Sequence, residues 1–205
     1  MSETCLINAL NVEGLTVSRG ARRLFEGLSL SISAGEAVML SGANGAGKTS
    51  LLRAIAGLLR PEAGTVSFGE IEPEAARAGA LHLIGHHDGL KSQRTAADEF
   101  EFWSDWLGGA PADRARAIEA FQLEPLMRLD VRVLSAGQRR RLALSRLRAA
   151  PRPLWLLDEP MAPLDTFWRA ALGQMMLAHL RTGGMILAAA HDPLPIPARI
   201  VEVGG

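Results

Sequence analysis

The sequence predicts an α/β fold in which a mostly parallel sheet is flanked by helices. Three observations support this prediction. Short apolar runs typical of buried strands alternate with segments of helical periodicity, which favours parallel strands joined by helical crossovers. A glycine-rich loop joins one of these runs to a helix, and residues 95 to about 150 have helical periodicity. We therefore expect a parallel core that carries an inserted α-helical sub-domain.

The strand-like segments differ in their pattern of apolar side chains. Residues 6–17 and 28–32 alternate apolar and polar side chains, which predicts an N-terminal antiparallel β portion. Residues 36–40 are almost wholly apolar, which indicates a central parallel strand. Residues 49–59 repeat leucine and isoleucine at helical spacing, and Pro61 is expected to end this helix. Further strands are expected at 64–68, 80–84, 154–157, 185–190 and 200–203, and a helix at 166–181.

Length and charge limit how the chain can be organised and what it can bind. We expect a single domain of residues 1–205, with a core formed by 1–90 and 151–205 and a helical sub-domain at about 91–150. The formal net charge is +0, whereas a nucleic-acid binder of this size would normally carry a basic excess. Nucleic acid is therefore not expected as a partner.

The cysteine content and the N-terminus indicate a cytosolic chain. The single cysteine, Cys5, cannot form an intramolecular disulfide, and a passive free thiol is favoured over a catalytic one. The N-terminus lacks the basic start and apolar core of a secretion signal. No stretch reaches the ~20 apolar residues that cross a bilayer. Any membrane that the protein serves is expected to be spanned by other chains.

A phosphate-binding loop is expected between the strand 36–40 and the helix that follows it. Every fixed position of the pattern G-x-x-x-x-G-K-[ST] is matched by residues 42–49 (GANGAGKT). Glycines let successive backbone N–H groups converge on an anion, and the helix dipole adds positive potential. Lys48 can reach the β- and γ-phosphates, and the Thr49 hydroxyl suits a magnesium ion. The expected nucleotide-binding residues are Gly42, Ala43, Asn44, Gly45, Ala46, Gly47, Lys48, Thr49 and Ser50.

An acidic pair follows the apolar strand at 154–157. The carboxyl ends of parallel strands are the places where α/β sheets bind ligands. Asp158 is therefore a candidate magnesium ligand beside Thr49, and Glu159 is a candidate to polarise a water in line with the γ-phosphate. We expect ATP and Mg²⁺ as ligands, with Lys48 and Glu159 acting in hydrolysis.

A second helix start also has the features of a phosphate site. Ser135 is a natural N-cap, Gly137 allows close backbone approach, and a helix N-terminus attracts phosphate. A single subunit needs only one helix start to bind one γ-phosphate. In two subunits packed head to tail, each bound ATP would meet one helix start from each subunit. We therefore expect a homodimer on ATP binding, in which Ser135, Gly137 and Gln138 of each copy cover the ATP of the other. The basic run 139–141 is expected to be an ordinary polar face of this helix.

Residues 134–138 (LSAGQ) resemble the signature motif of the ABC superfamily, and they lie between the two nucleotide motifs as in that superfamily. Asp165 resembles its D-loop aspartate, and His191 resembles its switch histidine. The motifs occur in the family's order over most of the chain. The resemblance implies an ABC-type P-loop NTPase with a RecA-like core that couples ATP hydrolysis to transport, and it implies a catalytic role for His191.

At finer grain the chain resembles the ATP-binding subunits of cytochrome c maturation systems, also called haem exporter ATPases. The resemblance rests on residues 84–91 (IGHHDGLK), on Thr95 and Ala96, on 24–29 (LFEGLS), on 134–141 (LSAGQRRR) and on the compact end at Gly205. It implies integral membrane permease subunits as partners and a peripheral position on the cytoplasmic face of the inner membrane. It also implies that hydrolysis drives haem export or release of the haem chaperone.

The helical sub-domain would transmit movement to those membrane partners. Phe100, Phe102, Trp103 and Trp106 are candidates for the contact surface. The alternative is a place in the core of the sub-domain, which is favoured at least as much for Trp103, because Phe100, Trp103 and Leu107 share one face of the predicted helix.

Two positions depart from the wider superfamily. Arg19 stands where an aromatic residue is expected to stack on adenine, and its guanidinium plane can stack in the same way. His87 stands at the position of the Q-loop glutamine, where it could hydrogen-bond a water or lie near magnesium. A metal or haem site built from His82, His86 and His87 is not favoured, because their spacing gives no convergent cage.

Other functions remain open from the sequence. The chain could be the ATPase of another ABC transporter, or a soluble ABC ATPase that acts on ribosomes or DNA, although such proteins usually carry two nucleotide domains or a long insertion. It could also be a nucleotide-dependent binding module without turnover. Membrane fractionation would separate the soluble class from a transport subunit, and a Glu159→Gln variant would test turnover.

Overall fold

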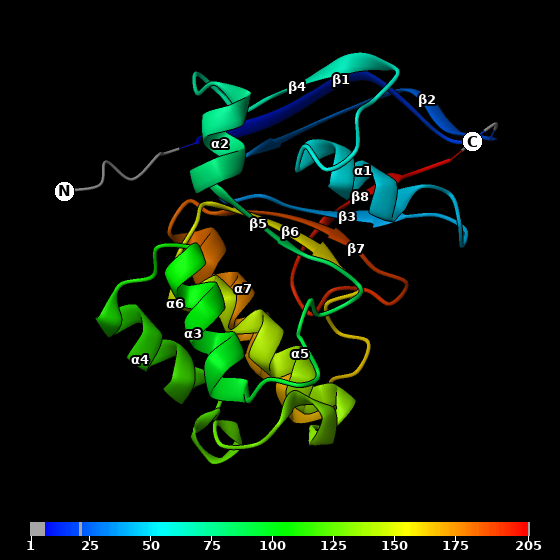
Figure 1. Cartoon of the computed structure of the whole chain (residues 1–205). Helices are drawn as coiled ribbons and strands as arrows, with labels where there is room; N and C mark the ends of the chain where they lie inside the picture. The colour runs from blue at the N-terminus through cyan, green and yellow to red at the C-terminus, as the bar shows by residue number, and fades with distance from the viewer. Residues whose placement is uncertain (1–6, 21, 205) are drawn as a thin grey trace.

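The computed structural model describes residues 7–20 and 22–204 and places them in two sheets with helices on both sides of the larger one (Figure 1). Cys5 and Gly205 lie outside the described residues, and so does Leu6, where the predicted strand 6–17 begins. The strands are β1 (Ala9–Arg19), β2 (Arg22–Ser33), β3 (Ala37–Ser41), β4 (Ala63–Ser67), β5 (Leu81–Ile84), β6 (Leu154–Asp158), β7 (Met185–Ala189) and β8 (Arg199–Glu202). The helices are α1 (Lys48–Ile55), α2 (Pro73–Gly79), α3 (Ala96–Trp106), α4 (Pro111–Ala120), α5 (Ala136–Leu144), α6 (Arg146–Ala149) and α7 (Thr166–Arg181), with short 3₁₀ turns at Glu124–Leu126 and Val131–Val133.

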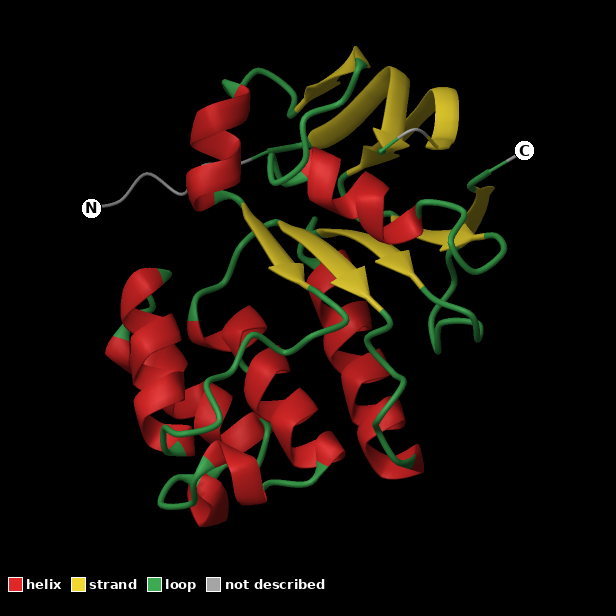
Figure 2. Ribbon diagram, turned by 45° about the vertical axis from the view of Figure 1, so that its right-hand side comes forward, coloured by secondary structure: helices red, strands yellow, loops and turns green. Residues whose placement is uncertain are grey.

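The larger sheet has five strands in the order β5-β6-β7-β3-β8. Every neighbouring pair in it is parallel, which confirms the predicted parallel core. All residues of β6 and β7 are buried, because helices cover one face of the sheet and α1 covers the other (Figure 2). The register pairs Leu40 of β3 and Asp158 of β6 with Ala189 of β7, so these three strands end at the same edge.

The smaller sheet is antiparallel, with the strand order β2-β1-β4, and it confirms the predicted N-terminal β portion. Helix α1 lies between the two sheets (Figure 1). Its buried side chains, Leu51, Leu52 and Ile55, join those of Leu10 and Leu15 from β1 in one apolar cluster. The burial of α1 on both sides fixes the position of its first residue, Lys48.

Helices α3 to α7 lie on the opposite face of the larger sheet (Figure 1). Their apolar side chains form a second cluster with β6 and β7, to which Phe100 and Leu147 belong. The sequence analysis offered Phe100 as a candidate for the contact surface, and its burial in this cluster corrects that expectation. Phe102 and Trp106, from the same helix, are 42% and 75% exposed.

The helix after the phosphate loop is shorter than predicted. It ends at Ile55 and not at residue 59, because Gly57 adopts a left-handed φ of 76°. The Gly57 N–H donates to the Ala54 carbonyl, and the Leu58 N–H donates to the Arg53 carbonyl, which is the Schellman pattern of helix termination. Glycine rather than the later proline therefore ends this helix.

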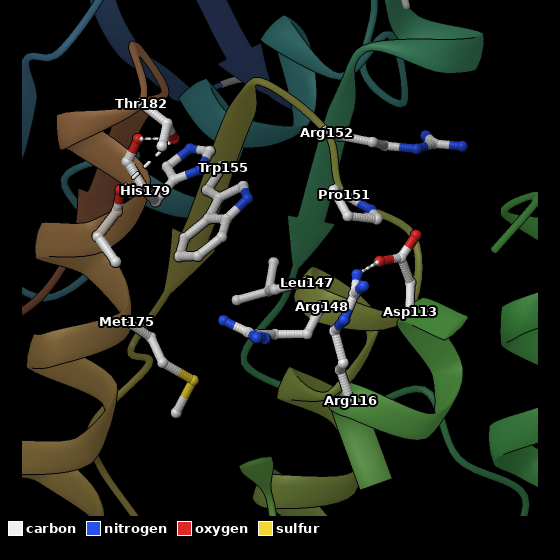
Figure 3. Close-up of a pocket in the computed structure, with 11 residues that line it drawn as sticks. Asp113, Arg116, Leu147, Arg148, Pro151, Arg152, Trp155, Met175, His179 and Thr182 are labelled. Atoms are coloured by element: carbon white, nitrogen blue, oxygen red, sulfur yellow. Dashed lines mark hydrogen bonds and ion pairs between the residues drawn. The ribbon is translucent and has the colours of Figure 1, made fainter. Parts of the chain in front are cut away.

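One buried and one partly buried histidine lie near the amino ends of β5 and β6. His82 donates from Nε2 to the Ala150 carbonyl oxygen at 2.7 Å, and burial lowers its pKa to about 3. His179 stacks on Trp155 with ring centroids 3.8 Å apart, and burial lowers its pKa to about 4 (Figure 3). Both pKa values lie below that of an unfolded histidine, so the folded chain holds these rings neutral.

The depressed pKa of His82 predicts acid sensitivity of the fold. The unfolded state binds a proton near pH 6.5 and the folded state does not, so stability is complete above that pH and falls as the pH drops toward 3. Between pH 7 and pH 5 we expect wild type to lose about 2 kcal/mol more unfolding free energy than a His82→Gln variant. Urea unfolding at the two pH values measures this difference. Replacement of the exposed His87 by Gln serves as the control substitution. A wild-type slope in His82→Gln would contradict the assignment.

Candidate nucleotide site

The loop between β3 and α1 has a shape that requires glycine at two positions. Gly42 has a φ of 133°, and a Cβ there would overlap the carbonyl oxygen of Val203. Gly47 has a φ of 108° and lies against the ring of Phe25. The loop therefore curls tightly between the end of β8 and strand β2, and α1 begins directly after it at Lys48.

The side chain of Lys48 lies along the inside of this loop. Lys48 is buried, and its Nζ donates to the carbonyl oxygens of Gly42 at 2.6 Å and Ala43 at 3.2 Å. The ammonium group is thus held beside the start of α1, where unpaired N–H groups and the helix dipole are also positive. Such a concentration of positive charge and donors suits a phosphate group.

A cavity of about 440 Å³ lies in front of the loop. It brings together most of the residues that the sequence proposes for nucleotide, metal and hydrolysis, although they come from segments far apart in the chain. Gly42 and Ala43 do not line it and contribute their carbonyl groups to Lys48 instead. The lining residues are Arg19, Leu24, Asn44, Gly45, Ala46, Gly47, Lys48, Thr49, Ser50, His86, Asp158, Glu159, Ala162 and His191.

A hydroxyl and a carboxylate meet at the floor of the cavity. Thr49 Oγ1 donates to Asp158 Oδ2 at 2.9 Å, which connects the start of α1 to the end of β6. Asp158 is 4% exposed and has no basic side chain as a hydrogen-bond partner among the described residues. Oxygen ligands of this kind fit a hard cation such as Mg²⁺, which binds through one or two carboxylates plus phosphate oxygens.

Glu159 and His191 both line the cavity and lie next to each other. Glu159 Oε1 lies 3.6 Å from His191 Nε2. The backbone of Glu159 has a left-handed φ of 49°, which is strained for a residue with a Cβ. Its N–H donates to the Ala189 carbonyl at 2.8 Å, so the strand-end hydrogen bonds hold the backbone in place. The carboxylate therefore lines the phosphate cavity next to the imidazole of His191.

The start of α5 forms a separate hollow. The Ser135 hydroxyl accepts from the Gln138 N–H, and the Gln138 side chain accepts from the Ser135 N–H, which makes a capping box. Ser135, Gly137 and Gln138 line a cavity of about 330 Å³ that they share with Asp165, and none of them lines the phosphate cavity of the same chain. One chain thus carries both predicted phosphate surfaces, but it does not bring them together.

The two residues that depart from the superfamily pattern differ in position. Arg19, at the end of β1, lines the cavity and is exposed, as an adenine contact would need to be. His87 is exposed and does not line the cavity, whereas its neighbour His86 does. The structure therefore brings His86, which the sequence analysis did not propose for this site, to the phosphate cavity.

The prediction that residues 139–141 form an ordinary polar helix face is wrong for Arg140. Arg140 is 1% exposed and donates to the loops after β5 and β6. Arg141 is half-buried, with its guanidinium 4.4 Å from the centre of the Trp168 ring. Nothing in the sequence distinguishes Arg140 from its neighbours, because a run of three arginines does not show which one turns inward.

Residues 7–20 and 22–204 contain neither a cluster of metal-ligating side chains nor a membrane-spanning helix. No group of three or more His, Cys, Asp or Glu side chains is placed to hold a metal ion. No helix in these ranges is long and apolar enough to cross a membrane.

The chain has clear relatives among known proteins. The family model described as "ABC transporter" matches residues 25–162. The "Cytochrome c biogenesis ATP-binding export protein CcmA" of Rhodopseudomonas palustris strain BisB5 is 48% identical over 95% of this chain and 98% of its own length. The protein of that name from Nitrobacter winogradskyi is 45% identical over 96% of this chain and 98% of its own length.

Solved structures share the fold. An ATP-binding subunit of an ABC transporter superposes with a TM-score of 0.79 at 25% identity, over 89% of this chain and 79% of that one. A dimeric ATP-binding cassette, MJ0796, in a post-hydrolysis state bound to ADP and Pi superposes with a TM-score of 0.75 at 22% identity, over 89% of this chain and 88% of that one.

The position of Lys48 predicts a strong effect on nucleotide affinity. A Lys48→Ala variant should bind ATP about 10- to 100-fold more weakly, because a charge-assisted hydrogen bond contributes about 1.5–3 kcal/mol. Titration with a fluorescent ATP analogue measures the affinity. Lys91, an exposed lysine outside the cavity lining, provides a matched control, and its replacement by Ala should leave the affinity unchanged. Equal affinities of the two variants would contradict the assigned site.

Proposed function

This chain belongs to the ABC transporter family and is an ATPase, and we propose that it is the ATP-hydrolysing subunit of a cytochrome c maturation system. In that system, hydrolysis would drive haem export or release of the haem chaperone. The observation that carries the proposal is the likeness to relatives named for cytochrome c biogenesis, which extends over 98% of their length. The cavity at the ends of β3, β6 and β7 supports the enzymatic part.

The cavity residues account for binding of ATP. The amides at the start of α1 and the Lys48 ammonium would hold the β- and γ-phosphates, and Arg19 would stack on the adenine at the rim of the cavity. Thr49 and Asp158 would hold Mg²⁺, which when bound neutralises charge on the phosphate oxygens. Gly42 and Gly47 keep the loop close enough for these contacts.

Hydrolysis needs a water that attacks the γ-phosphorus in line with the bridging oxygen. Glu159 would accept a hydrogen bond from this water, so that a new P–O bond forms while the bond to the β-phosphate oxygen breaks. His191, 3.6 Å from the Glu159 carboxylate, would orient the carboxylate and contact the γ-phosphate. His86 lines the same cavity and is a better candidate than His87 for a contact with the water or phosphate.

A second copy of the chain would complete each site. Ser135, Gly137 and Gln138 form a helix start with a free hollow, but they do not line the phosphate cavity of their own chain. Two copies packed head to tail would place this helix start of one copy over the ATP of the other. The cassette structures similar to this chain include dimers, one of them bound to ADP and Pi, which supports the arrangement.

We further propose that helix α3 contacts integral membrane permease subunits. Phe102 and Trp106 on this helix are exposed, whereas Phe100 is buried and Trp103 is half-buried in the helical layer. Exposed aromatic side chains are enriched where a partner protein binds. This contact would hold the ATPase at the cytoplasmic face of the inner membrane.

The role of Glu159 is tested by a Glu159→Gln variant. The amide cannot act as a base, so hydrolysis should fall at least about 100-fold while ATP affinity changes little. Phosphate release and nucleotide titration measure the two quantities. Size-exclusion chromatography with ATP should show a longer-lived dimer than that of wild type. Phosphate release at the wild-type rate would refute the role of Glu159.

The membrane assignment is tested by affinity purification from native membranes. Membrane subunits needed for c-type cytochrome formation should co-purify with the wild-type chain and be reduced with a Trp106→Glu variant, since a buried charge at the contact is unfavourable. Leu58 is also an exposed apolar residue but lies after α1, so Leu58→Glu serves as the control. Both variants should hydrolyse ATP alone at the wild-type rate. Normal c-type cytochromes in cells that lack the wild-type chain would contradict the proposed pathway.

A further inference from the structure

Arg140 is the largest fully buried side chain among the described residues, and no motif assigns it a role. Only 1% of the residue is exposed. A guanidinium group cannot give up its proton inside a protein, so the charge is buried with it. Such burial is costly unless every N–H finds an acceptor and the charge finds a partner.

The surroundings of Arg140 satisfy both conditions. Its five N–H groups have five acceptors: two lie on the loop after β5, one is the last residue of β6, and two lie on the turn that follows β6. Nη1 donates to Gly85 O (2.8 Å) and Asp88 Oδ1 (3.0 Å), Nη2 donates to Asp158 O (2.8 Å) and Glu159 O (3.0 Å), and Nε donates to Pro160 O (3.3 Å). The charge is therefore compensated by one carboxylate and four carbonyl dipoles.

Three of these acceptors belong to the backbone that carries the proposed catalytic carboxylate. Glu159 has a left-handed φ of 49°, a conformation that costs free energy and persists only where surrounding contacts impose it. The Ala189 carbonyl holds its N–H, and Arg140 holds its carbonyl and those of both neighbours. The direction of the Glu159 side chain into the phosphate cavity follows from this backbone conformation.

Arg140 also connects this backbone to two other parts of the site. Its own helix, α5, begins with the Ser135–Gln138 turn that would cover the ATP of a second copy. The Gly85 carbonyl and the Asp88 carboxylate flank His86, which lines the phosphate cavity. One rigid guanidinium fork thus joins the catalytic turn, the His86 loop and the signature helix.

We propose that Arg140 is a positioning residue for ATP hydrolysis, which holds the Glu159 turn and the His86 loop in their active arrangement against α5. This inference rests on the proposed role of Glu159. Arg140 does not line the phosphate cavity, and it would act through the carbonyl oxygens of the turn. Its loss should therefore slow the chemical step and leave ATP binding, which depends on the phosphate loop, largely intact.

An Arg140→Lys variant tests the proposal. Lysine keeps the charge but lacks the planar fork, so it cannot reach both loops at once. We expect kcat for ATP hydrolysis to fall about 10- to 100-fold, the scale of a displacement of about 1 Å in a catalytic group, while KM for ATP changes less than about threefold. An unchanged kcat would overturn the proposal.

A matched control separates positioning from general stability. Arg146 is also buried, and it donates to the Asp88 carbonyl and stacks on Trp103, but it makes no hydrogen bond to residues 158–160. Arg146→Lys should lower the midpoint of thermal unfolding at least as much as Arg140→Lys, with a smaller loss of kcat. Equal loss of kcat at equal loss of stability would show that Arg140 is merely structural.

A Glu159→Gln background shows through which residue Arg140 acts. The residual hydrolysis rate of Glu159→Gln should fall less than about twofold when Arg140→Lys is added, because the group that Arg140 positions is already lost. A further 10- to 100-fold loss would show that Arg140 acts independently of Glu159. If Glu159→Gln alone hydrolyses ATP at the wild-type rate, the proposed role of Glu159 is wrong. The comparison of the two single variants with the double variant shows this separately from the role of Arg140.

An Asp88→Asn variant covers the case in which Arg140→Lys does not fold. It removes the only carboxylate partner of the guanidinium and leaves the four carbonyl bonds in place. Asp88 is partly exposed, so the substitution creates no buried cavity. We expect kcat to fall several-fold with KM for ATP unchanged, and the effect should disappear in the Glu159→Gln background. An unchanged kcat in Asp88→Asn would likewise overturn the proposal.

Discussion

The whole site depends on one constraint, which is that three parallel strands end at the same edge of the sheet. Backbone pairing aligns Leu40 of β3 and Asp158 of β6 with Ala189 of β7, so the loops that follow them begin at one edge of the sheet. The phosphate loop, the acidic turn and His191 follow these three strands in turn. Strand spacing of about 4.8 Å brings their side chains within reach of one phosphate chain. Backbone hydrogen bonds between the strands therefore determine where the site residues lie relative to one another.

Backbone conformations that are unfavourable elsewhere are concentrated at this edge. Gly42 and Gly47 adopt positive φ where a Cβ would meet neighbouring atoms, and Glu159 adopts positive φ although it has a Cβ. The contacts that impose the Glu159 conformation come from β7 and from α5. Packing of the helical layer against the sheet is thus connected to the direction of the Glu159 side chain, for which we propose a catalytic role. Strain of this kind is typical of sites whose groups must be held in one arrangement.

Helix α5 takes part in two sites at once. Its first turn, capped by Ser135, points to a hollow that is open in the single chain, and the next turn carries Arg140 into the core beneath the acidic pair. A movement of the first turn on closure with a second copy would therefore reach the Glu159 backbone through a short and rigid path. Every N–H of the buried arginine donates a hydrogen bond to an acceptor on this path. Hydrogen bonds of a charged group have a defined geometry, so the connection is more rigid than an apolar contact.

The sequence by itself determined the parallel sheet, the phosphate loop, the acidic pair and the capped start of α5. These features depend on residues close together in the chain, whose apolar period, glycine content and capping groups specify local structure. The sequence did not determine that Arg140 is buried, or that His86 rather than His87 faces the cavity. Those outcomes were decided by the tertiary structure, because the partners of Arg140 lie 18 to 55 residues away and a side chain turns inward only where distant acceptors meet it.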